Sequence, residues 1–81
     1  MKYMAALVTV RTPDPAVLPA ELERARALTE QGVLVAGYIA HDRQRGWMVV
    51  EAESQEAARE AIESLPFARY WSIEITALAE P

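Results

Sequence analysis

The spacing of hydrophobic residues along the chain changes several times, and each change marks a separate element of secondary structure. Residues 3–11 are rich in valine, leucine and alanine, which predicts a first strand that ends at the proline-rich residues 12–15. A helix is predicted from Pro19 to a left-handed cap at Gly32. The apolar stripe of this helix consists of Leu22, Ala25 and Leu28, with Glu21 among the polar residues beside it.

The middle of the chain predicts a β-hairpin followed by a second helix. Residues 33–40 form an almost continuous apolar run, residues 41–46 are polar, and residues 47–52 are again mainly apolar. This pattern is typical of two antiparallel strands joined by a short loop. Ser54 is expected to cap a helix that Pro66 stops. The core-facing stripe of that helix consists of Ala58, Ala61, Ile62 and Leu65.

A last strand is predicted over residues 70–78, and strand alternation divides its side chains between two faces. One face, expected to join the core, carries Trp71, Ile73, Ile75 and Ala77. The other face, expected to line a pocket, carries Tyr70, Ser72, Glu74 and Thr76.

The predicted order is strand, helix, strand, strand, helix, strand. This is the α+β, ferredoxin-like βαββαβ arrangement, an antiparallel four-stranded sheet with both helices on one face. The second strand has apolar residues at both parities, and strands of that kind normally have both faces covered. A second copy of the chain is the simplest cover for the face without helices.

Size and composition narrow the class of protein further. The chain has 81 residues, 52% of them hydrophobic, which predicts one domain over residues 1–81. A lone domain of this size buries only about 60% of its extended surface, so oligomerisation is expected. The net charge of -4 argues against a nucleic acid partner, and no segment approaches the roughly 20 apolar residues of a membrane span. Without cysteines nothing indicates an oxidising compartment, and a cytoplasmic location is predicted.

Glu74 is the leading candidate for catalysis. A strand carboxylate inside a closed pocket loses water, which makes it a stronger base and suits it to proton transfer. The alternative is that Glu74 pairs with an arginine across a dimer, or lies at a hydrated margin of the sheet, because structural ion pairs often resemble functional carboxylates. His41 is the single histidine and a second candidate acid or base, although its place in the polar hairpin loop favours a solvated turn.

The remaining candidates are ligand-binding hydroxyl groups. Tyr70 shares the predicted parity of Glu74, Tyr38 lies on the second strand, and Ser72 and Thr76 flank Glu74. Each of these side chains can donate a hydrogen bond to a small organic acid, although strand tyrosines more often serve packing. One histidine and scattered carboxylates do not predict a metal site, and no motif predicts a cofactor.

The segment from Gly32 to Leu78 resembles the muconolactone isomerase group of the dimeric α+β barrel superfamily. The shared features are the helix that ends in glycine, the hairpin length, Ser54 at the start of the second helix, and then Leu65-Pro66, Tyr70 and Ile73-Glu74. The resemblance implies that two copies pack their open sheet faces into a barrel around a ligand cavity, and that dimers assemble into a larger ring.

The function implied by this resemblance is proton-transfer isomerisation of a small unsaturated organic acid or lactone, by an isomerase of the muconolactone isomerase type. The second strand, however, carries Val33, Val35 and Ala36 where the family is expected to be polar. A non-catalytic ligand-binding or oligomer-forming barrel protein therefore stands as the alternative.

Overall fold

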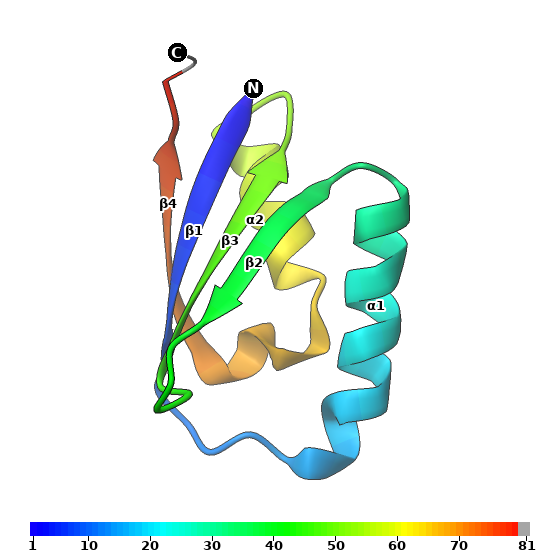
Figure 1. Ribbon diagram of the computed structural model, residues 1–81, viewed down its shortest axis with the longest axis vertical. Helices are drawn as coiled ribbons and strands as arrows, with labels where there is room; N and C mark the ends of the chain where they lie inside the picture. Colours follow the sequence, from blue (N-terminus) through cyan, green and yellow to red (C-terminus); the bar gives the residue numbers. More distant parts are fainter. Residues whose placement is uncertain (80–81) are drawn as a thin grey trace.

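The computed structural model describes residues 1–79 and has the predicted order of strands and helices (Figure 1). The strands are β1 (Lys2–Thr9), β2 (Leu34–Ile39), β3 (Arg45–Glu51) and β4 (Trp71–Ala77). The helices are α1 (Leu18–Glu30) and α2 (Gln55–Glu63), with short 3-10 helices η1 (Pro15–Val17) and η2 (Pro66–Tyr70) before α1 and β4. The ferredoxin-like fold class predicted from the sequence is confirmed.

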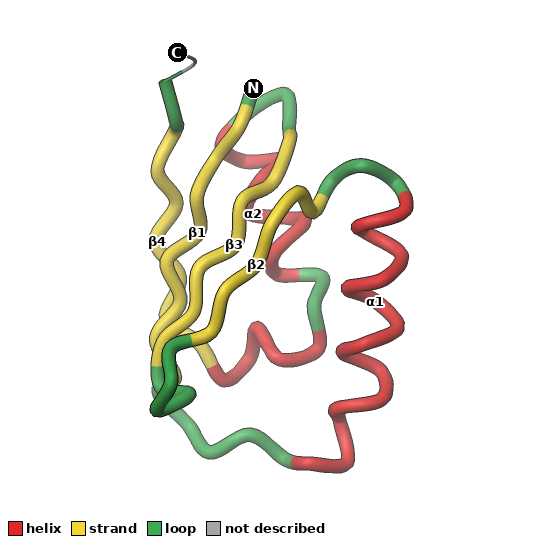
Figure 2. The backbone as a smooth tube through the Cα atoms, viewed as in Figure 1, coloured by secondary structure: helices red, strands yellow, loops and turns green. Residues whose placement is uncertain are grey.

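The four strands form one antiparallel sheet in the order β2-β3-β1-β4. Both helices lie on the same face of this sheet, and Figure 2 shows the other face bare. The central strand β1 sets the two faces. Tyr3, Ala5 and Leu7 are buried toward the helices, so Met4 and Ala6 point the opposite way.

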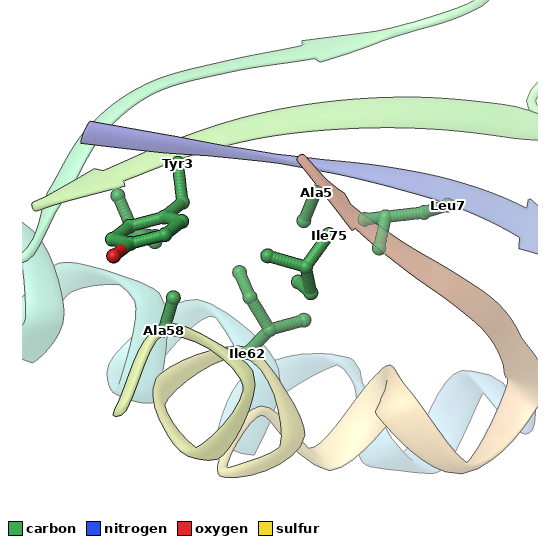
Figure 3. Packing of buried hydrophobic residues seen from close by; sticks show 7 residues of the cluster. Tyr3, Ala5, Leu7, Ala58, Ile62 and Ile75 are labelled. Carbon is green, nitrogen blue, oxygen red and sulfur yellow. The ribbon is translucent and has the colours of Figure 1, made fainter. Parts of the chain in front are cut away.

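The core lies between the sheet and α2 (Figure 3). Ala58 and Ile62 of α2 are fully buried against Ile75 of β4 and the inward residues of β1. The prediction of this stripe is confirmed for Ala58, Ile62 and Leu65, which are at most 1% exposed, whereas Ala61 is half-buried.

The predicted end of the first helix and the predicted start of the second helix are both confirmed. Gly32 has a φ of 76°, a conformation that glycine adopts without strain, and it ends α1 as predicted. The Ser54 side chain accepts a hydrogen bond of 3.1 Å from the backbone N–H of Ala57, which satisfies a free donor at the start of α2. The polar loop is shorter than predicted, because Arg45 and Gly46 already belong to β3.

The predicted stripe of α1 is wrong at its first position. Leu22 is 60% exposed, whereas Glu21 is only 7% exposed and Leu28 is buried as expected. The reason is that α1 packs on η2 as well as on β2, and its Glu21 carboxylate accepts a hydrogen bond of 2.8 Å from the backbone N–H of Phe67 in η2. A backbone N–H group removed from water needs a hydrogen-bond acceptor. The helix therefore turns Glu21 toward Phe67 and leaves Leu22 exposed.

Glu21 is a buried carboxyl group that links α1 to the turn before β4. Burial raises the pKa of Glu21 above its ordinary value of 4.5, because water is lost around the charged form, while the hydrogen bond from Phe67 acts in the opposite direction. The folded protein therefore holds this proton to a higher pH than the unfolded chain. As the pH rises through the folded-state pKa, the group ionises in a buried place and folding stability falls.

We predict that Ile62→Ala lowers the free energy of unfolding by about 2–5 kcal/mol, since the change leaves a cavity at the centre of the core. Leu22→Ala is the matched control and should change stability by no more than about 0.5 kcal/mol, because Leu22 is exposed. Urea unfolding followed by circular dichroism measures both. If Leu22→Ala lowered the free energy of unfolding as much as Ile62→Ala does, Leu22 would have to be buried, which would contradict the structure.

We predict that Glu21→Gln raises stability at neutral pH, because the amide oxygen still accepts the Phe67 N–H bond while no buried charge forms. The gain over the wild type should disappear below the ordinary carboxyl pKa of 4.5 and widen as the pH rises. Glu21→Ala, which removes the acceptor, should cost about 1–3 kcal/mol even in acid. Thermal unfolding across a pH series measures these effects, and a pH-independent difference for Glu21→Gln would contradict the assignment.

Candidate functional site

The candidate site is the face of the sheet that carries no helix, here called the open face. The strand register places four of its side chains in one row across the sheet. Glu74 of β4 is opposite Ala6 of β1, Ala6 is opposite Trp47 of β3, and Trp47 is opposite Tyr38 of β2. The small side chain of Ala6 therefore lies between the carboxylate and the indole ring in this row.

Two further rows border the first. On one side the register aligns Thr76, Met4, Val49 and Ala36. On the other side it aligns Ser72, Val8 and Arg45. The middle of the open face is therefore apolar, and its polar groups lie along β4 and at the β3 end near the hairpin loop.

Glu74 is exposed and takes part in no ion pair or side-chain hydrogen bond within residues 1–79. Trp71, Ile73 and Ile75 point toward the helices, as their burial and their contact with the core indicate. The predicted parity of β4 thus holds for Ser72, Glu74 and Thr76, which share the open face. An ion pair across a dimer, the alternative considered for Glu74, stays a prediction.

Tyr38 also lies on the open face and is 67% exposed. Three inter-strand steps separate it from Glu74, which is about 14 Å between backbones at the usual strand spacing. Tyr38 and Glu74 therefore lie on opposite edge strands of the sheet and do not form one cluster of side chains.

Tyr70 is the last residue of η2 and does not belong to β4, which begins only at Trp71. Its direction is set by the 3-10 turn and not by strand alternation. The ring of Tyr70 meets Phe67 edge to face, with centroids 5.8 Å apart, and the Arg69 guanidinium lies 6.0 Å from its centroid. The predicted start of the last strand at Tyr70 is therefore wrong by one residue, and the ligand-binding role of Tyr70 stays a prediction.

His41 is exposed in the hairpin loop, as the solvated-turn interpretation expects. The loop is held by Asp42, whose carboxylate accepts a hydrogen bond of 2.9 Å from the backbone N–H of Gln44, and by Arg43, whose φ of 62° is left-handed. His41 and Glu74 do not meet within one chain. In the described part of the chain, no three histidine, cysteine or acidic residues gather as metal ligands would.

Trp47 and Arg45 also lie on the open face, although they were not among the site residues predicted from the sequence. Their place on this face follows from the pairing of β3 with β1, and that pairing brings together segments about 40 residues apart in the sequence. The alternation within residues 45–51 was the available signal, but the predicted loop end at Gly46 left Arg45 out of it.

The open face is not a closed cavity in one chain. The hollows on the described surface, with volumes of about 330 to 510 Å³, lie beside β4 on the helix side, at the end of β1, and between the two helices. Enclosure of Glu74 therefore requires a second surface. No helix within residues 1–79 has the length and apolar character to cross a bilayer.

Comparisons with known proteins agree with this architecture. A search of the curated proteins found no match. Among solved structures, a crystal structure of muconolactone isomerase superimposes with a TM-score of 0.77 at 25% sequence identity, and the alignment covers 100% of this chain and 91% of that one. The sequence model of the muconolactone delta-isomerase family matches residues 3–81. Since that match spans all four strands and both helices, the chain belongs to the muconolactone delta-isomerase family.

Proposed function

We propose that this protein is an isomerase of the muconolactone isomerase type, which moves a proton within a small unsaturated organic acid or lactone. The observation that carries the proposal is the position of Glu74, an unpaired carboxylate on a largely apolar sheet face. Membership of the family supports the same reaction class.

The site is completed when two copies join their open faces into a barrel. In the single chain Val8 is 42% exposed and Met4, Ala6, Trp47 and Val49 are only half-buried, although nearly all of this surface is apolar. Covering it would contribute about 25 cal/mol for each Å² of apolar area removed from water. A contiguous apolar surface of this kind is typical of an interaction site.

The chemistry needs one group that accepts a proton and returns it. Glu74 removes a proton from a carbon next to a carbonyl, the electron pair moves into a conjugated enolate, and the protonated Glu74 returns the proton to another carbon of that system. The double bond has then moved, with no net gain or loss of atoms or electrons. Ser72 and Thr76, on the same face, donate hydrogen bonds to the substrate oxygens, and Trp47 packs on its planar part.

A non-catalytic ligand-binding or oligomer-forming barrel is the second candidate. The observation that favours it is the apolar row of Met4, Val49 and Ala36 beside Glu74, which supplies no second acid or base. In this case the two faces pack against each other and leave little space. Absence of turnover by the wild-type dimer with a series of unsaturated lactones would favour this candidate.

We predict that Glu74→Gln lowers kcat by about 10²–10⁴-fold with a smaller change in KM, because the amide keeps the shape but cannot accept the proton. Glu56→Gln is the matched control, since Glu56 is an exposed carboxylate in the first turn of α2 on the other side of the sheet. Lactone isomerisation followed by ultraviolet absorbance measures turnover. Full turnover by Glu74→Gln would remove the residue from the mechanism.

We predict that Val49→Lys converts the dimer into monomers at micromolar concentration, because the charge would lie in the middle of the joined apolar faces. Thr29→Lys adds the same charge at an exposed position of α1 and should leave the mass unchanged. Sedimentation equilibrium measures both. A wild-type protein that is already monomeric would contradict the proposed assembly.

A further inference from the structure

A hollow on the helix side of the sheet, here called the β4-edge pocket, lies between α2, η2 and β4. It has a volume of about 380 Å³. Its lining residues are Arg59, Glu63, Ala68, Arg69, Trp71 and Ile73. Trp71 and Ile73 alternate with Ser72 and Glu74 along β4, so the pocket and Glu74 lie on opposite faces of the same strand.

Three arginine side chains donate hydrogen bonds to backbone carbonyl groups around this pocket. Arg69 donates from Nε to the carbonyl of Pro66 at 3.1 Å, and Arg59 donates to the carbonyl of Ile73 at 3.5 Å. Arg11, from the segment after β1, donates to the carbonyl of Arg69 at 2.7 Å. These bonds come from three separate parts of the chain and hold the guanidinium groups near the junction of η2 and β4.

The two arginines that line the pocket are not neutralised by carboxylates. The ion pairs within residues 1–79 join the N-terminus to Glu51 and Arg26 to Glu30, and Glu63 forms none although it lines the same pocket. A guanidinium group has five N–H donors, so a single bond to a carbonyl leaves most of them free. With Arg59, Arg69 and Glu63 in its lining, the pocket has two positive charges and one negative, a net charge of +1 in a chain whose net charge is -4.

Unpaired guanidinium groups match the geometry of oxyanions, to which they can donate two parallel hydrogen bonds. Beside them Trp71 and Ile73 provide an apolar wall, and both are half-buried. We propose that the β4-edge pocket binds a small organic oxyanion, a carboxylate or a phosphate. Arg59 and Arg69 hold its charged group, and Trp71 packs on its apolar part.

The β4-edge pocket is separate from the proposed isomerase site. In the proposed dimer, which joins only the open faces, the helix side of β4 would stay uncovered and the pocket accessible. The inference therefore does not depend on Glu74 or on turnover.

The test is a titration with inorganic phosphate and with benzoate at constant ionic strength. In a Trp47→Phe background Trp71 is the remaining tryptophan, and its fluorescence should change saturably. The side-chain Nε–H signals of Arg59 and Arg69 should shift in parallel in NMR spectra. Arg59→Gln and Arg69→Gln should each weaken binding by about tenfold, the loss expected for a charged hydrogen bond.

Arg26→Gln is the matched control, because Arg26 is an exposed arginine on α1 that pairs with Glu30, and it should bind as the wild type does. Glu74→Gln should also bind normally. Saturable binding of phosphate alone, or of benzoate alone, supports the pocket and identifies which oxyanion it prefers. A rise in the melting temperature of the wild type with the bound anion gives a second measurement that needs no variant.

Three results would overturn the proposal. The first is the absence of saturable binding of either anion to the wild type. The second is an equal shift of the Arg26 signal, which would indicate general screening of charge rather than a site. The third is a change of mass in the Arg59 and Arg69 variants with anion binding unaltered, which would make the pocket a contact between copies of the chain.

Discussion

The structure depends on burial that is complete on one side of the sheet and incomplete on the other. Side chains of a strand alternate between two faces, but both helices lie on the same face. β1 shows the consequence, because Ala5 is fully buried while its neighbours Met4 and Ala6 are only half-buried. The helix side holds the fold together, and the open face stays uncovered within residues 1–79.

Small residues shape both faces. On the helix side, Ala5 and Ala58 are fully buried, and their short side chains bring α2 close enough for Ile62 to fill the centre of the core. On the open face, the strand register places Ala6 between Glu74 and Trp47. The same strand therefore supports close packing on one side and puts only a small side chain between the carboxylate and the indole on the other.

Features that depend on local chemistry were predictable from the sequence. The cap at Ser54, the left-handed Gly32 and the alternation that separates Glu74 from Ile75 each involve a few neighbouring residues. Burial of Glu21 was not predictable, because it depends on η2, which lies 46 positions away at Phe67. The row that joins Glu74 to Trp47 and Tyr38 likewise depends on strand order and register, which hydrophobic periodicity does not determine.

The position of Glu74 also bears on the choice between an enzyme and a scaffold. A carboxylate that is buried without a partner loses its hydration, and this penalty is several kcal/mol in a closed apolar surface. A face that served only to join two subunits would be more stable with an apolar residue at this position, because its cross-strand neighbours on β1 are Ala6, Met4 and Val8. A cavity that leaves room for a substrate beside Glu74 avoids packing the carboxylate directly against apolar side chains, and proton transfer needs a substrate within hydrogen-bond reach of the base.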